Sequence, residues 1–267
     1  MSDYGSVAPS LLIAQVLGEF RVAIGGRAIG SMDWHHGSAE RLLKLILVTP
    51  RHRLRREVAA ELLWPGSPSG RGAVNLRRAY HFLGRALEPD PAGGLLLHEA
   101  SMVGLAPTVD LDLDLDRLSR GLDRLDRTLS MRDDGLQGSS LELSAAADAV
   151  LAVGGGELLP DDGHEDWLAT HRDHLLIRWE EVLLRSAAAL DRCGERIQAA
   201  ALVRQVLATD PADEDAHRLA IQLYVQGGHH HAARRQLQAC RRAMRDAYGL
   251  DPSPSTFAAL RVEPSPA

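Results

Sequence analysis

The chain has 267 residues, of which 45% are hydrophobic and 25% are charged, and its formal net charge is −6. This length suits two ordinary domains, and no apolar run approaches the roughly 18 residues of a membrane span. Residues 1–10 lack the basic start and apolar core of a secretory signal, and two cysteines are too few for a disulfide framework or a four-thiolate zinc site. We therefore expect a cytoplasmic protein with no membrane partner and a disordered N-terminus at 1–10.

Residues 11–108 contain the elements of one small α+β domain. Apolar and polar residues alternate over 11–30, which is typical of short strands joined by tight turns. Three helical apolar stripes follow, at 38–48, at about 54–64 and at about 71–87. Residues 95–105 then predict a hairpin that turns at Glu99–Ala100. This order of elements indicates a winged helix-turn-helix, whose third helix enters the major groove of DNA.

The apolar stripes identify the side chains that are expected to face the core. In the second helix these are Val58, Ala59, Leu62 and Leu63. In the third they are Leu76, Tyr80, Leu83 and Leu87, and arginines occupy much of the remaining surface. The third helix is therefore expected to be amphipathic, with a strongly basic outer face.

Positive charge is concentrated in this predicted DNA reader. Between Arg51 and Leu87, eight arginines stand against two glutamates, a local excess of six positive charges. Arginine can bridge guanine O6 and N7, and asparagine suits adenine. We therefore expect base contacts from one side of the third helix, which carries Arg71, Asn75, Arg78 and Arg85. The alternative is a solvated helix face in an arginine-rich protein.

Further basic residues are candidates for contacts with the DNA backbone. Arg51, Arg53, Arg55 and Arg56 lie between the first two helices, where phosphate contacts would position the protein without reading sequence. His98 and Ser101 fall in the hairpin, where contact with the backbone competes with an ordinary polar surface as the interpretation. The complete set of predicted DNA-binding residues is Arg51, Arg53, Arg55, Arg71, Asn75, Arg77, Arg78, His81, Arg85 and His98.

Residues 109–260 are predicted to be all-helical, with a tail at 261–267. Helices are expected near 115–129, 141–153 and 166–183. A repeat follows with a period of 34 residues, in which Leu190, Gly194, Ala199 and Val206 recur as Tyr224, Gly228, Ala233 and Cys240. This is the tetratricopeptide period, so tetratricopeptide-like hairpins are predicted, and Cys193 and Cys240 are interpreted as small core residues.

Two other patterns suggest chemistry but have simpler interpretations. His229, His230 and His231 are possible metal ligands, yet adjacent side chains diverge and no cysteine or carboxylate has ligand spacing, so a solvated turn is expected. Four aspartates alternate with leucine from Asp110 to Asp116, which suggests either paired catalytic acids or a linker or interdomain salt-bridge strip. No nucleophile elbow or phosphate-binding loop is present. We expect no enzymatic activity, cofactor or metal.

Motifs spread over 12–254 resemble those of one known family. They are Val16-Leu17-Gly18-Glu19-Phe20 with Gly26-Arg27, Ala60-Glu61-Leu62-Leu63-Trp64-Pro65, Asn75-Leu76-Arg77-Arg78-Ala79, Val109-Asp110-Leu111-Asp112, Leu158-Leu159-Pro160 with Trp167, Asp210-Pro211 with Glu214 and His217, and Tyr248-Gly249-Leu250-Asp251-Pro252-Ser253-Pro254. In this order they resemble the bacterial transcriptional activator domain family, the architecture of antibiotic regulatory proteins. One departure is Gly84-Arg85, where the family often has consecutive arginines.

The resemblance implies DNA binding by the winged helix and self-association or contact with the transcription machinery by the helical domain. The leading hypothesis is a sequence-specific duplex-DNA-binding transcriptional regulator, an activator as the family implies. Its expected partners are duplex DNA and RNA polymerase or other regulator proteins, with a homodimer as one arrangement. The alternative is a tetratricopeptide-like protein-interaction scaffold whose winged helix does not bind DNA. The affinity of a DNA-binding protein for DNA should fall steeply as the salt concentration rises, whereas the affinity of a peptide-binding groove for its peptide need not.

Overall fold

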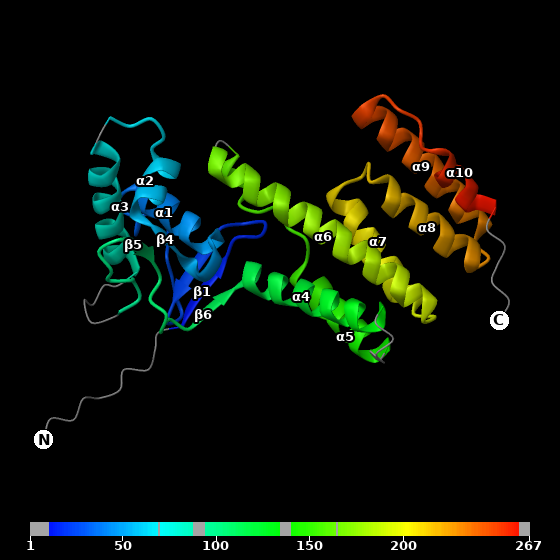
Figure 1. Cartoon of the computed structure of the whole chain (residues 1–267), viewed down its shortest axis with the longest axis horizontal. Coiled ribbons are helices and arrows are strands. Elements are labelled where there is room, and N and C mark those ends of the chain that lie inside the picture. The colour runs from blue at the N-terminus through cyan, green and yellow to red at the C-terminus, as the bar shows by residue number, and fades with distance from the viewer. Residues whose placement is uncertain (1–10, 69, 88–93, 134–139, 164, 262–267) are drawn as a thin grey trace, which may run out of the picture. The chain divides into compact units, whose positions relative to one another are not determined.

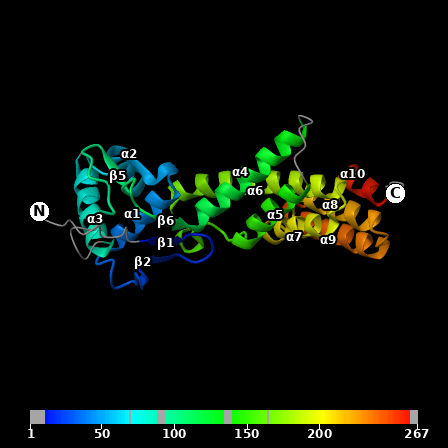
Figure 2. The same ribbon diagram turned by 90° about the horizontal axis from the view of Figure 1, so that it is seen from below.

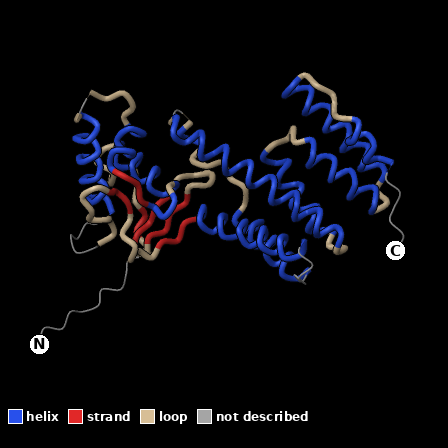
Figure 3. The backbone as a smooth tube through the Cα atoms, in the orientation of Figure 1, coloured by secondary structure: helices blue, strands red, loops and turns tan. Residues whose placement is uncertain are grey.

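The computed structural model describes residues 11–68, 70–87, 94–133, 140–163 and 165–261 (Figure 1). The chain divides into two compact units. The first comprises the chain up to Asp116 together with Leu158–Arg172, and the second comprises Arg117–Glu157 and the residues from Asp173 onward. The strands belong to the first unit, and the second is built from helices (Figure 3). The expected α+β winged helix-turn-helix followed by an all-α tetratricopeptide-like region is confirmed.

The first unit contains a four-stranded sheet with the order β3-β2-β1-β6. Strands β1 (Leu12–Gln15), β2 (Arg21–Ile24) and β3 (Arg27–Ala28) form an antiparallel meander. Strand β6 (Leu111–Leu113) joins β1 in parallel, with Leu12 opposite Leu111. The alternation that predicted strands also sets the burial, because Leu12 and Ala14 are buried whereas Ile13 is exposed.

Three helices form the helix-turn-helix core beside this sheet. They are α1 (Gly37–Val48), α2 (Arg56–Leu63) and α3 (Arg71–Leu87). Helix α1 is buried along most of its length, and its side chain Leu42 is 0% exposed. A central helix of this kind must be apolar on nearly all sides, which explains its leucine-rich sequence.

Two details of the expected helix-turn-helix are wrong. Helix α2 begins at Arg56 instead of near Leu54, because strand β4 (Arg53–Arg55) holds Leu54 in extended backbone. Val58 was expected to face inward but is 46% exposed, since Ala59 and Leu63 supply the buried face of this short helix.

The expected hairpin at 95–105 is present, but only one of its two arms is a regular strand. Its second arm is strand β5 (Met102–Gly104), which pairs with β4 in an antiparallel ribbon. The first arm makes a single bridge between Leu96 and Leu105 and a backbone hydrogen bond of 2.9 Å from Leu97 to Gly104. The prediction of a second regular strand is wrong, because the contacts of the first arm amount to an isolated bridge and not to a strand.

The aspartate run at 110–116 is not a linker. Leu111–Leu113 lie in the sheet, and the buried Asp114 carboxylate accepts hydrogen bonds from the backbone N–H groups of Val16 (3.0 Å) and Leu17 (2.9 Å). Asp116 pairs with His52 of the winged helix, as expected of a salt-bridge strip against the basic reader, and both residues belong to the first compact unit. Asp114 therefore holds the end of β1 in place.

The second unit consists of successive helical hairpins. Its elements are α4 (Asp114–Asp133) from Arg117 onward, α5 (Ser140–Val153), α6 (Asp166–Arg192) from Asp173 onward, α7 (Arg196–Thr209), α8 (Glu214–Gln226), α9 (His230–Tyr248) and α10 (Pro254–Ala258). Helices α8 and α9 run side by side (Figures 1 and 2). In the part of the chain that the structure describes, no helix has the length and apolar character of a membrane span.

The 34-residue repeat corresponds to the hairpins α6–α7 and α8–α9. Gly194 and Gly228 occupy equivalent turns and both have positive φ, +87° and +76°, a conformation that favours glycine. Ala199 and Ala233 follow at equivalent buried positions. Of the two cysteines, Cys240 is buried as expected, and burial raises its pKa to about 11. Cys193 is only half-buried, because it lies in the last turn before Gly194.

Candidate nucleic-acid interface

Helix α3 separates an apolar face from a basic face. Leu76, Leu83 and Leu87 of the predicted apolar stripe are buried, whereas Tyr80 is half-buried and Ala79 completes the buried face. The side chains at Arg71, Val74, Arg78, His81 and Arg85 are exposed and recur at spacings of three and four residues, which places them along one line of the helix. The sequence of α3 contains no aspartate or glutamate. The exposed line of α3 therefore carries basic side chains and no acidic ones, with Val74 as its apolar member.

The remaining predicted residues of α3 lie beside this line. Arg77 is exposed but points about 100° away from Arg78, as adjacent helical residues must. Asn75 is half-buried at the edge of the exposed surface. Among the described residues, Arg71, Arg77, Arg78 and Arg85 form no ion pair, so no carboxylate in that part of the chain neutralises them.

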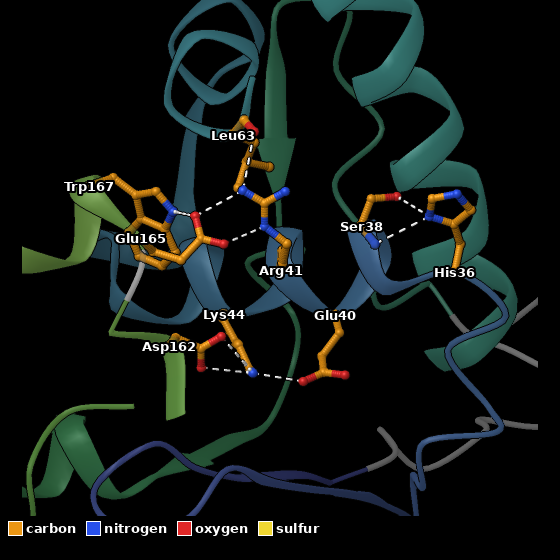
Figure 4. Close-up of polar contacts among 9 residues, drawn as sticks. All are labelled: His36, Ser38, Glu40, Arg41, Lys44, Leu63, Asp162, Glu165 and Trp167. Carbon is orange, nitrogen blue, oxygen red and sulfur yellow. Dashed lines mark hydrogen bonds and ion pairs between the residues drawn. The ribbon is translucent and has the colours of Figure 1, made fainter. Parts of the chain in front are cut away.

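An aromatic contact that the sequence did not reveal orders the middle of this surface. Phe82 stacks on His36, with ring centroids 5.9 Å apart and planes inclined by 11°. The guanidinium of Arg78 lies 5.6 Å from the centroid of Phe82. His36 also caps α1, since its Nδ1 accepts a hydrogen bond of 3.3 Å from the backbone of Ser38 (Figure 4). His36 thus couples the start of α1 to the position of Arg78 on α3.

The predicted phosphate contacts lie on the ribbon of β4 and β5. Leu54 faces inward opposite Val103, so Arg53 and Arg55 project from the other face of β4. Arg55 is exposed and Arg53 is half-buried. Arg51 precedes the strand, exposed, with a φ of +59°. Of these three side chains, Arg51 and Arg55 are therefore more available to solvent than Arg53.

The hairpin carrying His98 is braced against α2 and α3. The Tyr80 hydroxyl lies 2.6 Å from the carbonyl oxygen of Leu97 and 3.1 Å from that of Gly104. Arg56 lies over the Tyr80 ring at 5.3 Å, and its backbone N–H donates to Ser101 at 3.0 Å. The Arg56 side chain is therefore part of the brace. His98 and Ser101 remain exposed at the tip.

Ion pairs with residues far along the chain hold helix α1 in place (Figure 4). The Lys44 ammonium group lies 2.8 Å from an Asp162 carboxylate oxygen and 2.7 Å from Glu40. Burial by itself would lower the pKa of Lys44, but its hydrogen bonds to Asp162 and Glu40 outweigh this and raise the pKa above its ordinary value. Lys44 is therefore a buried cation held by two carboxylates.

A second ion pair also holds helix α1 in place. Arg41 forms a two-pronged ion pair with Glu165 and donates a 3.2 Å hydrogen bond to the carbonyl oxygen of Leu63 at the end of α2. The indole N–H of Trp167 donates to the same Glu165 at 2.8 Å. The segment around 158–172 therefore fixes both α1 and the end of α2, the helices that support α3.

His52, just before the ribbon of β4 and β5, is also held by a residue far along the chain. Its Nε2 donates to Asp116 at 3.1 Å and its Nδ1 donates to the carbonyl oxygen of Leu47 at 3.2 Å. A carbonyl oxygen and a carboxylate both accept, so both contacts are hydrogen bonds when the ring is doubly protonated. The hydrogen bond to Asp116 raises the pKa of His52 above its ordinary value, although burial opposes the shift. His52 lies between Arg51 and Arg53 and so anchors that part of the ribbon.

A family model described as bacterial transcriptional activator domain matches residues 113–261, more than half of the chain. The chain belongs to the bacterial transcriptional activator domain family. The resemblance inferred from the sequence motifs is confirmed. No curated protein sequence matches the chain.

A solved structure shares the fold. Mycobacterium tuberculosis EmbR, solved in complex with a low-affinity phosphopeptide, matches with a TM-score of 0.66 at 17% sequence identity. The match covers 94% of this chain and 64% of the EmbR chain, so this member of the family spans less than two thirds of EmbR. The likeness extends across both units of the chain described above.

The structure explains several motifs of the bacterial transcriptional activator domain family. Leu158 bridges to Leu17, and the Leu159 N–H donates to Val16 at 2.8 Å, so the Leu-Leu-Pro motif attaches to the winged-helix unit. In the helical unit, the Glu214 carboxylate accepts a 2.8 Å hydrogen bond from the N–H of Ser253. These family motifs therefore serve the packing of each unit.

Other predicted patterns have no part in this interface. His229 precedes α9 and His230 begins it, and among the described residues no group of three or more His, Cys, Asp or Glu side chains could hold a metal ion. The buried His217 lies 3.0 Å from the carbonyl oxygen of Pro211 and 2.7 Å from Gln236, so it joins α8 to the loop before it and to α9.

Proposed function

We propose that the chain is a sequence-specific DNA-binding transcriptional activator that reads duplex DNA with α3. The observation that carries this proposal is the exposed line of Arg71, Arg78, His81 and Arg85 on a helix without acidic residues. In a winged helix-turn-helix this helix enters the major groove, where arginine is the commonest specific partner of guanine. Asn75, at the edge of the line, would contact adenine.

The ribbon would then supply contacts that position the protein without reading sequence. Arg51 and Arg55 are exposed and Arg53 is partly so, and phosphate contacts account for most hydrogen bonds in protein–DNA complexes. His98 lies at the exposed tip of the braced hairpin, in the place of a wing. Arg77 would contact the phosphate backbone beside the groove, because it points away from the line of Arg78.

The test is an electrophoretic mobility shift of the purified chain on its own upstream region and neighbouring promoters, with unrelated DNA as competitor. We expect a discrete shift that resists competitor and weakens with salt through counterion release. The triple variant R77A/R78A/R85A should lose the shift while retaining its circular dichroism spectrum and urea midpoint. R234A/R235A, which removes two exposed arginines of α9, is the matched control. Equal affinity of the α3 variant and wild type would overturn the proposal.

A second candidate function is a protein-interaction scaffold, and a hollow surface in the helical unit favours it. Two hollows of about 720 and 280 Å³ share Leu207 and Gln236 as lining residues. Apolar side chains of α7, α8 and α9 line them together with Arg196, Arg204 and Arg242. In the activator this surface would hold RNA polymerase, another regulator or a second copy. In a pure scaffold it would be the only site, and DNA binding would be absent at every salt concentration.

A further inference from the structure

Helix α3 exposes an apolar side chain in the middle of its basic line. Val74 is 58% exposed and lies one helical turn before Arg78 and three residues after Arg71. Of the exposed large hydrophobic side chains in the described part of the chain, Val74 alone belongs to α3. Ala73 beside it is also exposed.

Folding alone gives no reason for valine at this position. A β-branched side chain loses rotamer freedom in a helix, and an exposed site would favour alanine or a long polar residue. More than half of the surface of Val74 is in solvent. What valine offers at an exposed site is an apolar contact surface without donors or acceptors.

The major groove presents one apolar group, the C5 methyl of thymine. We propose that Val74 is a specificity-determining residue that packs on a thymine methyl in the operator. This inference rests on the proposed function, because it assigns a base to the helix that reads DNA. The two exposed apolar positions in the first half of α3 suit this contact, since the N-terminal residues of a recognition helix contact base edges.

The neighbouring arginine sets where this thymine lies. The Arg78 guanidinium lies 5.6 Å from the centroid of the Phe82 ring, which is itself stacked on His36, and this contact favours one position of the guanidinium. An ordered arginine suits bidentate contact with guanine. Val74 and Arg78 are one turn apart, about 5.4 Å along the helix, and base pairs are stacked roughly 3.4 Å apart. The thymine should therefore lie within about two base pairs of the guanine that Arg78 reads.

The experiment begins by selecting bound sites from a pool of random duplexes with the full chain. Each thymine of the selected site is then replaced singly by deoxyuridine, which removes only the methyl group, and affinity is measured. We expect one position near a guanine to lose affinity roughly fourfold, the worth of one buried methyl. The V74A variant should bind the thymine site about as weakly as wild type binds the deoxyuridine site, and should be indifferent to the replacement.

A matched control separates this contact from a general loss of apolar surface. V58A removes the same groups from an exposed valine of α2 and should keep the wild-type response to deoxyuridine. V74A is not expected to unfold the chain, because alanine has the higher helix propensity. Normal DNA binding with no deoxyuridine effect, or an effect that persists in V74A, would overturn the inference and leave the proposed function standing. Failure to select any site would overturn both.

Discussion

An Asp162 carboxylate oxygen lies 2.8 Å from the ammonium group of Lys44, although 118 residues of chain separate them. Replacing Asp162 with alanine leaves a buried ammonium group with Glu40 alone, and loss of one partner of a buried ion pair is strongly destabilising. We expect D162A to lower the free energy of unfolding by about 3 kcal/mol in urea titrations. E19A, which removes the exposed Glu19–Arg21 pair, should leave the urea midpoint unchanged.

The double variant K44M/D162L tests whether this loss comes from the stranded charge. Replacing both members of a buried pair with apolar residues is often nearly neutral, because no ion is then left without its partner. We expect K44M/D162L to be more stable than D162A in the same titrations. A double variant as unstable as D162A would show that packing around the pair, and not its charge, is what matters.

Stability should fall as the pH rises past the range in which His52 is protonated. The folded chain holds the imidazolium between Asp116 and the carbonyl oxygen of Leu47, so its pKa lies above the ordinary value of 6.5. The contribution is complete below 6.5 and is lost as the pH rises through the raised pKa of the folded state. Urea midpoints measured across this interval should decline in wild type. H52Q should remove the part of the decline that comes from His52. An H52Q profile identical to that of wild type would refute this prediction.

The dependence of DNA affinity on salt concentration should show how many arginines contact phosphates. Each phosphate contact contributes about 0.9 to the slope of log affinity against log salt concentration. We expect R51A and R55A each to reduce that slope by about one and to weaken binding equally on all sequences. R234A on α9 serves as control. A change in sequence preference in R55A would instead indicate base contact.

Two glycines should respond to alanine in opposite ways. A Cβ added at Gly104 would lie 2.7 Å from the Cα of Arg53, so the ribbon would have to separate, and we expect G104A to destabilise the fold by about 2 kcal/mol. A Cβ at Gly84 would make an ordinary 3.5 Å contact with Leu96, and α3 passes through Gly84 without a break. G84A should therefore stabilise the chain by about 0.5–1 kcal/mol, measured by urea unfolding.

Much of the candidate interface could be predicted from the sequence, because most of its residues lie on one helix. The apolar stripe of α3 defines its buried face, and the positions of Arg71, Arg78 and Arg85 on the opposite face follow from helical periodicity. The stack of His36 on Phe82 was not predictable, since 46 positions separate the two rings and neither residue has a sequence signature. The separate role of Arg56 likewise depends on Tyr80, which only the packing of α3 brings near.

The sequence by itself determined many of the local elements: the strands within 11–30, the three helices of the winged helix-turn-helix and the 34-residue hairpin repeat. Each of these is specified by neighbouring residues, through alternation, apolar periodicity or a glycine at a turn. The tertiary structure alone decided that β6 joins β1 and that Leu158–Arg172 returns to the first unit. Such pairings depend on complementary groups far apart in the chain, as with Lys44 and Asp162, and they leave no periodic pattern in either segment.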